Sequence, residues 1–367
     1  KKMEPSTSWF KTLCWGLTRV SAVNDTGGMR AAVLQGHGDI DKLQVREDMP
    51  IPQPGGSEVL IRVGASAVNN TDINTRVGWY SQNDHGEDTS WSGSPMKFPR
   101  IQGADCCGEI TKVGSSIDPE RIGERVLVRT MQEPANVDGK LTPITLGSEI
   151  NGAFAQYVSV RSSEAFAINS SLDDAELASF PCSYSTAEGL LQRAQVGGER
   201  VLITGASGGV GSAAVQLAVM RGATVFAVTT RTHADQVRHI GAAEIVDRDG
   251  DLLDQLGELR VDVVIDLVGG PHFASLLRIL RPGGRYATAG AVAGAHVALD
   301  LRDLYLKDLT FYGCTFHPKS VFTDLISYVE QERIQPLVAA RYDLSDIHAA
   351  QERFIEKDFI GKIAIVT

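Results

Sequence analysis

The residues with the clearest chemical meaning form a glycine-rich turn, which reads GASGGVG at 205–211 after the short apolar run at 201–204. Apolar residues at helical spacing follow at 214–220. A strand, a glycine turn and a helix in this order suit a dinucleotide pyrophosphate, because the free N–H groups of the helix start face the anion. A glycine-rich turn without a ligand is the alternative. The three positions of the G-x-G-x-x-G pattern are Ala206, Gly208 and Gly211.

A cation, Arg231, follows the second predicted strand, at the position where dinucleotide-binding sites distinguish NAD from NADP. In an NAD site, an Asp or Glu at the end of the second strand holds the ribose 2′-hydroxyl. Here that stretch reads TTRTH at 229–233, and no carboxylate appears before Asp235. The guanidinium of Arg231 can pair with a 2′-phosphate, and a charged hydrogen bond contributes roughly 1.5–3 kcal/mol. We therefore predict NADPH as the cofactor, bound by Thr230, Arg231 and His233; a solvated cation at a helix start is the alternative for Arg231.

Alternating strand and helix patterns must position these residues. Apolar runs predict strands at 201–204, 223–228, 245–246, 261–268, 285–290 and 310–314. Helical patterns lie between them at 233–240, 251–256 and 273–280. Strands that alternate with helices are typical of the α/β doubly wound class, in which helices cover both faces of a parallel sheet.

The bulk properties exclude several classes of protein. The 367 residues are 43% hydrophobic and 22% charged, an ordinary globular composition with room for two domains. A formal net charge of −10 argues against a nucleic-acid partner. No apolar run reaches the roughly 18 residues of a membrane span. The five cysteines include no CxxC pair, which favours a reducing compartment and a cytoplasmic location.

The first 28 residues differ from the rest, because they contain Ser, Thr and basic residues but only two acids, Glu4 and Asp25. This bias is typical of a mitochondrial targeting segment. An upstream start, an expression remnant or an arm that packs on a partner are the alternatives.

The part that follows is rich in predicted strands, which makes it unlike the α/β half. Short alternating runs predict these strands at 29–34, 43–46, 59–63, 101–113 and 125–128. Two polar, glycine-containing insertions interrupt them at 81–99 and 132–147. We predict surface loops there, either without a role or folded over a cleft.

The order of a β-rich part followed by this fingerprint resembles the medium-chain dehydrogenase/reductase superfamily. The stretch GASGGVG followed by AAVQLA is similar to its zinc-independent quinone oxidoreductase and ζ-crystallin branch, and the match runs from 29 to the closing GKIAIV at 361–366 and Thr367. The resemblance implies a GroES-like catalytic domain at 29–182 and 317–367. It also implies a Rossmann domain at 183–316, after an N-terminal extension at 1–28.

Three positions bear on zinc. By the resemblance, Asn69 stands where zinc-dependent relatives have a Cys ligand, and Ala104 stands where they have the His of a Gly-His-Glu motif. Cys182 matches the third ligand. One thiolate out of three protein ligands does not hold Zn²⁺, so we predict no metal site.

Without a Lewis acid, the resemblance implies hydride addition to the activated double bond of a quinone, enone or enoyl substrate. Such an addition places charge on a remote oxygen, which hydrogen-bond donors can stabilise. The matching positions suggest Asn69 as a polar wall of the active site and Tyr80 as a proton donor. Asp72 is the third candidate, with a turn-holding carboxylate as its alternative role, and packing is the alternative for Tyr80. His317, at a strand end, could bind substrate or act as an acid.

The resemblance also implies the remaining cofactor contacts. Thr186 would touch the nicotinamide ring, backbone groups after the last two strands would hold the carboxamide, and Lys362 would lie near the cofactor or at the surface. The full predicted set is Thr186, Ser207, Gly208, Gly209, Val210, Thr230, Arg231, His233, Ala289, Gly290, Cys314, Phe316 and Lys362. Relatives commonly dimerise through the sheet of this domain, which implies a homodimer.

Three functions remain open at this point. The first is an NADPH-dependent reductase of activated double bonds that acts on a small molecule without zinc. The second is a non-catalytic NADPH-binding protein of the crystallin kind. The third is a zinc-type alcohol dehydrogenase. Polar residues near the cleft favour the enzyme, because sites rather than folds determine function.

Overall fold

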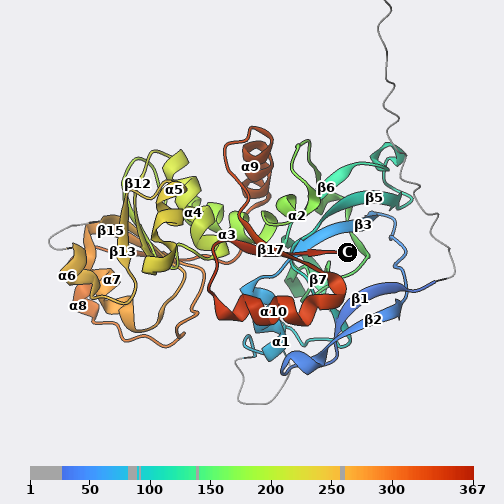
Figure 1. Ribbon diagram of the computed structural model, residues 1–367, viewed down its shortest axis with the longest axis horizontal. Coiled ribbons are helices and arrows are strands. Elements are labelled where there is room, and N and C mark those ends of the chain that lie inside the picture. The colour runs from blue at the N-terminus through green and yellow to red at the C-terminus, as the bar shows by residue number, and fades with distance from the viewer. Residues whose placement is uncertain (1–26, 82–88, 91, 138–139, 257–260) are drawn as a thin grey trace, which may run out of the picture.

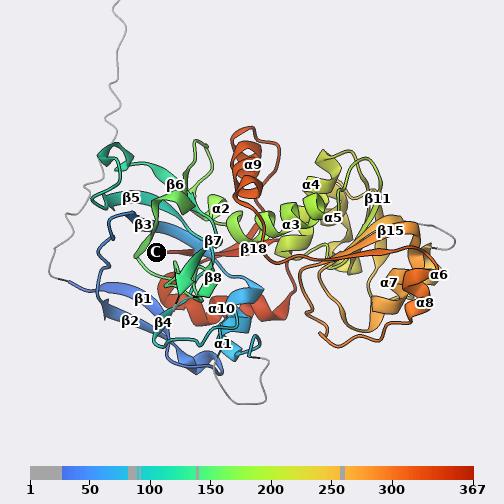
Figure 2. The same ribbon diagram turned by 180° about the vertical axis from the view of Figure 1, so that it is seen from behind.

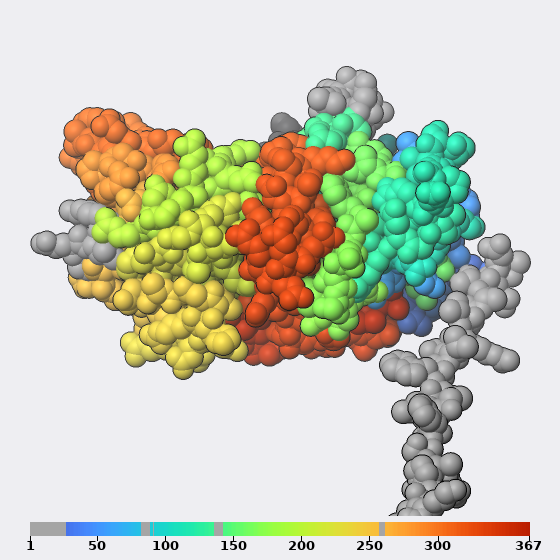
Figure 3. Space-filling model, turned by 90° about the horizontal axis from the view of Figure 1, so that it is seen from above, coloured from blue at the N-terminus to red at the C-terminus, as the bar shows by residue number. Residues whose placement is uncertain are grey.

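The computed structural model describes residues 27–81, 89–90, 92–137, 140–256 and 261–367. These residues form two lobes that lie side by side along the longest axis of the molecule (Figure 1). One lobe contains the strands within 200–313, and the other contains those within 29–167 together with the C-terminal strands within 338–366. Between the lobes lie two helices, α3 (Pro181–Arg193) and α9 (Lys319–Glu330), and Figure 3 shows α9 filling one face of the molecule between them.

A parallel sheet of six strands forms the first lobe, in the order β13-β12-β11-β14-β15-β16. The strands are β11 (Arg200–Ile203), β12 (Thr224–Thr229), β13 (Glu244–Asp247), β14 (Val261–Asp266), β15 (Leu280–Thr288) and β16 (Thr310–Gly313). The helices are α4 (Gly209–Met220), α5 (Ala234–His239), α6 (Leu252–Leu256), α7 (Phe273–Ile279) and α8 (Leu301–Tyr305). This strand order is that of the doubly wound nucleotide-binding fold, which confirms the predicted fold class.

Burial on both faces explains why the central strand β11 contains the apolar run at 201–203. Val201 and Ile203 of β11 pack into the core that includes α3 and α4. Leu202, between them, points to the opposite face and packs into a second core with Phe273 and Leu276 of α7. Each of the three β11 residues is fully buried, as expected for a central strand of a sheet covered on both sides.

The second lobe is built on antiparallel pairs. Its main sheet has the order β10-β6-β5-β3-β18-β17, with β9 also paired to β3, and a smaller sheet has the order β2-β1-β4. The strands are β1 (Met29–Leu34), β2 (Leu43–Met49), β3 (Glu58–Ala67), β4 (Arg100–Ile101), β5 (Cys107–Val113), β6 (Arg125–Val128), β7 (Met131–Val137), β8 (Lys140–Thr145), β9 (Tyr157–Arg161), β10 (Ala165–Ala167), β17 (Val338–Asp343) and β18 (Lys362–Val366). The helices are α1 (Asn70–Val77), α2 (Asp174–Leu177) and α10 (Ile347–Glu356).

The C-terminal strand connects this lobe to the glycine-rich turn. Strand β18 runs antiparallel to β3, with Ala364 opposite Ala67. Just before β18 begins, the N–H of Gly361 donates to the carbonyl of Ser207 in the turn, at 2.9 Å. Figure 2 shows β18 beside α3, where the two lobes meet. The chain thus returns from the parallel sheet to the β-rich lobe, while the exact predicted domain boundaries stay a prediction.

Two predicted segments in the β-rich lobe differ from the structure. The predicted strand at 101–113 is broken, because residues 102–106 leave the smaller sheet after β4, enter the main sheet only at β5, and carry polar groups into the site described below. The predicted loop at 132–147 is wrong, since β7 and β8 form an antiparallel hairpin there. An Asp-Gly pair at 138–139 separates these two strands in the sequence, and that pair is a strong hairpin signal.

The predicted targeting segment at 1–28 lies outside the described residues apart from its last two, and the insertion at 81–99 is described only at 81, 89–90 and 92–99. Among the described residues, none of the helices has the length and apolar character needed to cross a membrane.

Candidate active site

The glycine-rich turn joins β11 to α4 and leaves no room for a side chain at Gly209 or Gly211. A Cβ on Gly211 would lie 2.0 Å from the carbonyl oxygen of Gly205, and a Cβ on Gly209 would lie 2.8 Å from the Lys362 side chain. Helix α4 begins at Gly209, so its first N–H groups lack acceptors within the helix. This cradle fits a pyrophosphate. The predicted pyrophosphate residues lie together here: Ser207, Gly208, Gly209 and Val210.

The predicted 2′-phosphate residues also lie together, at the carboxyl end of β12. Arg231 begins a short 3₁₀ turn there. Its side chain is 89% exposed, and its Nε donates to Oδ2 of Asp247 at 2.6 Å. The hydrogen bond from Arg231 lowers the pKa of Asp247 below its ordinary value. His233 is buried, and its Nδ1 lies 3.0 Å from the hydroxyl of Thr230, so this ring supports the turn from its inner side.

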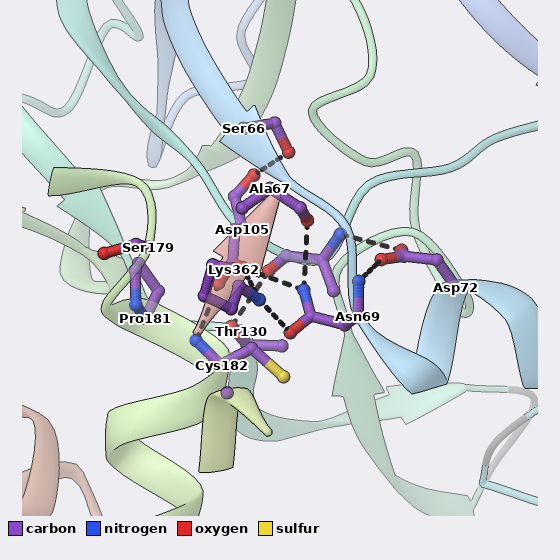
Figure 4. Close-up of polar contacts among 12 residues, drawn as sticks. Ser66, Ala67, Asn69, Asp72, Asp105, Thr130, Ser179, Pro181, Cys182 and Lys362 are labelled. Atoms are coloured by element: carbon purple, nitrogen blue, oxygen red, sulfur yellow. Dashed lines mark hydrogen bonds and ion pairs between the residues drawn. The ribbon is translucent and has the colours of Figure 1, made fainter. Parts of the chain in front are cut away.

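A buried polar cluster, the floor cluster, consists of Asn69, Asp105 and Lys362 (Figure 4). Lys362 Nζ donates to Asp105 Oδ2 at 2.9 Å and to Asn69 Oδ1, and Asn69 Nδ2 donates to the same Asp105 oxygen at 2.8 Å. The other oxygen of Asp105 accepts the backbone N–H of Cys182 at 2.7 Å. None of the three side chains belongs to a residue more than 5% exposed. The cluster therefore ties the starts of α1, α3 and β18 to the 102–106 segment.

The charges of the floor cluster compensate each other. Lys362 contributes one positive charge and Asp105 one negative charge. Removing one partner of such a buried pair destabilises a protein, because the charge of the other partner is then uncompensated. The alternative reading of Lys362 as a surface lysine is wrong, because the residue is 2% exposed. Its aliphatic chain passes the first turn of α4, where its Cδ would lie 2.8 Å from a Cβ on Gly209.

The amide of Asn69 is fully engaged within the protein. Besides its bond to Asp105, Nδ2 donates to the carbonyl of Ala67 at 3.1 Å, and Oδ1 accepts from Lys362. Both N–H groups are thus occupied, and no amide donor of Asn69 is left for a substrate oxygen. The residue lies in the floor cluster with its amide held in one orientation, and its role as a wall of the active site stays a prediction.

Asp72 lies next to this cluster and holds the start of α1. Its Oδ2 accepts the backbone N–H of Asn69 at 2.8 Å, and its Oδ1 accepts that of Ala104 at 3.1 Å. The residue is 3% exposed. Burial raises the pKa of Asp72 to about 7, with a smaller contribution from the nearby charge of Asp105. These two hydrogen bonds agree with the alternative role of Asp72, that of a carboxylate that holds a turn.

The raised pKa of Asp72 predicts a pH dependence of stability. The folded state binds this proton more tightly than the unfolded chain, whose ordinary pKa is 3.8. The stabilising contribution is therefore complete below about pH 4 and is lost as the pH rises through about 7, with about 1.4 kcal/mol for each pKa unit. We expect the free energy of urea unfolding to fall between about pH 4 and pH 7 in the wild type by more than in Asp72→Asn. An Asp41→Asn variant, changed at an exposed carboxylate, is the control; parallel pH curves for the wild type and Asp72→Asn would contradict the prediction.

Tyr80 lies at the end of α1, outside the floor cluster. Its hydroxyl donates to Oγ1 of Thr71 at 3.2 Å, and its ring packs edge-on against Trp79 with the ring centres 5.5 Å apart. Burial raises the pKa of Tyr80, so the phenol keeps its proton at neutral pH. A role as proton donor stays a prediction.

The first two turns of α3 carry Cys182, which matches the third metal-ligand position by the resemblance, and Thr186, which is predicted next to the nicotinamide. Burial raises the pKa of the Cys182 thiol well above its usual range, so it is protonated. The hydroxyl of Thr186 donates to the Cys182 carbonyl at 2.7 Å. In the part of the chain that the structure describes, no group of three His, Cys, Asp or Glu side chains lies close enough together to hold a metal ion.

The segments after β15 and β16 meet at the carboxyl edge of the sheet. The N–H of Cys314 donates to the carbonyl of Thr288 at 2.9 Å, which links the two strand ends. Arg193 of α3 donates to the carbonyls of Gly313 and Phe316, each at 2.8 Å. A small recess brings Thr186 together with Cys314 and Phe316, as predicted. Ala289 and Gly290 follow the end of β15 at the same edge.

Sequence reasoning missed three residues that organise the site: Asp105, Arg193 and Asp247. Asp105 follows Ala104 in the Gly-His-Glu-like stretch, so its motif position was a usable signal. Arg193 and Asp247 had no such signal, because each acts through a partner distant in the sequence.

Comparisons with known proteins agree with this architecture. The family described as "Alcohol dehydrogenase GroES-like domain" matches residues 55–170, and "Zinc-binding dehydrogenase" matches residues 209–331. A provisionally named alcohol dehydrogenase from Sinorhizobium meliloti 1021 is 43% identical, with a TM-score of 0.87 over 92% of this chain and 96% of that one.

Curated relatives carry several activities. An acryloyl-coenzyme A reductase of Sulfurisphaera tokodaii is 28% identical over 92% of this chain and 99% of its own length. An NADPH-dependent alkenal/one oxidoreductase of Arabidopsis thaliana is 30% identical over 84% of this chain and 72% of its own length. An NAD-dependent alcohol dehydrogenase of Sulfurisphaera tokodaii is 27% identical over 89% of this chain and 98% of its own length. With its GroES-like lobe, its doubly wound cofactor lobe and these relatives, the chain belongs to the medium-chain dehydrogenase/reductase superfamily of nicotinamide-dinucleotide-dependent oxidoreductases.

Proposed function

We propose that this protein is an NADPH-dependent reductase that adds hydride to the activated double bond of an enone, enoyl thioester or quinone without zinc. The floor cluster is the observation that carries this proposal. By the family resemblance, Asn69, Ala104 and Cys182 hold the three metal-ligand positions, and here the ammonium of Lys362 lies bonded to Asn69 and to Asp105 beside Ala104. The buried pair of the Lys362 ammonium and the Asp105 carboxylate thus takes the space that a metal and its ligands would need.

Hydride addition to an activated double bond is a reaction that a site without a strong Lewis acid can carry out. Bound NADPH supplies a hydride. When the β-carbon of an unsaturated carbonyl compound accepts it, the double-bond electrons move to the carbonyl oxygen, and the α-carbon then takes a proton. Hydrogen-bond donors suffice to stabilise that oxygen, which spreads its charge as an enolate. The chain holds the cofactor at the glycine cradle, and the recess beside Thr186 lies at the same sheet edge for its nicotinamide end.

Two observations support NADPH over NADH. The exposed guanidinium of Arg231 stands at the end of β12, and the neighbouring Asp247 carboxylate, which could hold a ribose hydroxyl, is already paired with it. The name of the Arabidopsis relative also states NADPH dependence. The names of the acryloyl-coenzyme A reductase and alkenal/one oxidoreductase relatives support an unsaturated carbonyl substrate.

The proposal is tested by following NADPH consumption with a panel of enones, enoyl-coenzyme A thioesters, quinones and saturated ketones. We expect turnover with at least one unsaturated class and none with saturated ketones. Zinc content well below one ion per chain and activity that survives a chelator are expected in the same preparation. Binding of NADPH without turnover on any acceptor would favour the non-catalytic role, and chelator-sensitive turnover of ketones or alcohols would favour a zinc alcohol dehydrogenase.

We also propose that the protein is a homodimer in a reducing, cytoplasmic compartment. The described cysteines, Cys106, Cys107, Cys182 and Cys314, are free thiols, as such a compartment favours. For the dimer, β16 ends the sheet order of its lobe, so its outer edge is open to a second copy. Apolar side chains are exposed in and near it, with Leu306 at 68%, Tyr305 at 61% and Phe311 at 36%.

Leu306→Glu should therefore convert the dimer into a monomer, because it places a charge within the apolar surface beside the sheet edge. The mass in solution, measured by light scattering, is expected to fall to about half while the thermal unfolding of the lobes is retained. Ile122→Glu, at an exposed apolar residue of the other lobe, is the matched control. A wild-type monomer, or a Leu306→Glu dimer, would contradict the prediction.

A further inference from the structure

His317 is a buried imidazole whose contacts the proposed reaction does not yet explain. The residue is 5% exposed, and within the described chain neither ring nitrogen has a hydrogen-bond partner. Buried polar atoms are nearly always paired, so two unpaired nitrogens on one ring point to a group that is bound there in the working protein.

The location of the ring indicates which ligand reaches it. His317 lines the small recess after β16 together with Thr186, Gly189, Cys314, Thr315 and Phe316. The glycine cradle for the pyrophosphate lies at the start of α4, between the two halves of the sheet. Arg231 marks the adenosine half at β12, so the other end of a bound dinucleotide extends towards β15 and β16. The recess therefore lies on the nicotinamide side.

The surrounding structure holds this ring in a defined place. A Cβ on Gly189 of α3 would lie 3.1–3.3 Å from the Cβ, Cγ and Cδ2 atoms of His317, so the glycine makes room for the imidazole. Arg129, which is 1% exposed, donates to the His317 carbonyl at 2.8 Å and pairs with the buried Glu164. Arg193 holds the neighbouring Phe316 carbonyl. Both lobes thus fix the loop that carries the ring.

The charge state of the ring further narrows the choice of ligand. Burial, together with the positive charges of Arg129 and Arg193, lowers the pKa of His317 to about 4. The ring is therefore neutral at physiological pH and offers one N–H donor and one nitrogen acceptor. It does not attract a phosphate as a cation would. A carboxamide, which carries an N–H₂ donor and a carbonyl acceptor, complements a neutral imidazole.

We propose that His317 is a positioning residue that hydrogen-bonds the carboxamide of the bound nicotinamide through its side chain. The inference rests on the proposed use of a nicotinamide cofactor and extends it. A hydrogen bond from this ring fixes the orientation of the carboxamide. It therefore also determines which face of the nicotinamide is turned towards the floor cluster.

Three variants and three ligands test the assignment. In His317→Leu the ring nitrogens are lost and apolar volume is kept, in His317→Asn a donor and an acceptor are kept, and Gly189→Ala displaces an intact ring. The ligands are NADPH, its reduced 3-acetylpyridine analogue, which lacks the carboxamide N–H₂, and adenosine 2′,5′-bisphosphate, which lacks the nicotinamide half. Dissociation constants are measured by titration calorimetry on the full chain.

We expect His317→Leu to weaken NADPH binding about five- to tenfold, the effect of one lost neutral hydrogen bond, and His317→Asn to restore part of it. Adenosine 2′,5′-bisphosphate should bind all proteins equally, which also shows that each variant is folded. The wild type should prefer NADPH to the acetyl analogue by a larger factor than His317→Leu does. Gly189→Ala should weaken NADPH binding while the helix keeps or gains thermal stability, because Ala favours a helix over Gly.

The inference is overturned if His317→Leu binds NADPH as tightly as the wild type, or if the preference over the acetyl analogue is the same in both proteins. An unchanged NADPH affinity with a raised KM for the acceptor would assign the ring to substrate instead, which also overturns it. If the wild type binds no nicotinamide dinucleotide at all, the proposed function itself fails, and the two failures are thus distinguishable.

Discussion

Lys362→Met should lower the free energy of unfolding by about 3–5 kcal/mol, because it removes one partner of a buried charge pair. Asp105 would keep its hydrogen bonds from Asn69 and from the backbone of Cys182, but its negative charge would be uncompensated at 0% exposure. Urea unfolding of the cofactor-free protein, followed by intrinsic fluorescence, measures this loss. Lys112→Met, which changes an exposed lysine of β5, is the control and should change stability by less than about 0.5 kcal/mol.

A double variant separates charge from packing in the same cluster. Asp105→Asn alone leaves the Lys362 ammonium without its counter-charge and should also destabilise the fold. Combining the two changes removes both charges, so we expect the double variant to be more stable than the sum of the single losses by about 1–3 kcal/mol. Additive losses would mean that the two side chains contribute independently. A Lys362→Met protein as stable as the wild type would contradict the buried pair altogether.

Arg231→Ala should lower the affinity for NADPH by about 10- to 150-fold, which corresponds to the 1.5–3 kcal/mol of a charged hydrogen bond. The affinity for NADH should rise or stay unchanged, because the loss of Arg231 frees the Asp247 carboxylate for a ribose hydroxyl. Dissociation constants for both reduced cofactors, measured on the wild type and on the variant, give the ratio directly.

Two further variants make this result specific. Arg238→Ala removes a guanidinium of α5 that pairs with Asp235 at 3.1 Å and should leave the preference unchanged. Asp247→Asn keeps Arg231 but removes its counter-charge, so NADPH binding should be retained or improved. If Arg231→Ala leaves the ratio of the two dissociation constants as it was, the proposed preference for NADPH is wrong, although the reductase chemistry could still stand with NADH.

Local pattern predicted much of the cofactor lobe. The segments 201–203 and 263–265, at the centres of two predicted strands, are continuously apolar because β11 and β14 are buried on both faces there. The roles of Gly208 and Gly211 in the turn could also be predicted, because the turn requires both glycines within a few residues of each other. In contrast, the hairpin of β7 and β8 was predicted as a loop because its strands carry many polar residues, and the Asp-Gly signal at 138–139 was not weighed.

The contacts within the floor cluster could not be predicted from a local pattern in the sequence. Asn69 and Asp105 are 36 residues apart, Lys362 and Asp105 are 257 apart, and Lys362 and Asn69 are 293 apart. The family resemblance placed Asn69 and Lys362 in the site, yet it did not show that the two side chains bond to each other. That contact exists because β18 pairs with β3 and begins beside the glycine turn.

The sequence by itself determined the doubly wound fold, the glycine-rich turn after β11 and the cation that follows β12. These features depend on residues close together in the chain, whose spacing sets their geometry. Only the tertiary structure decided that the Asn69 amide is fully occupied, that the Lys362 ammonium is buried and that neither nitrogen of His317 has a partner among the described residues. The hydrogen-bond partners and the burial of these three side chains come from segments distant in the sequence, so they exist only once those segments have packed together in the folded chain.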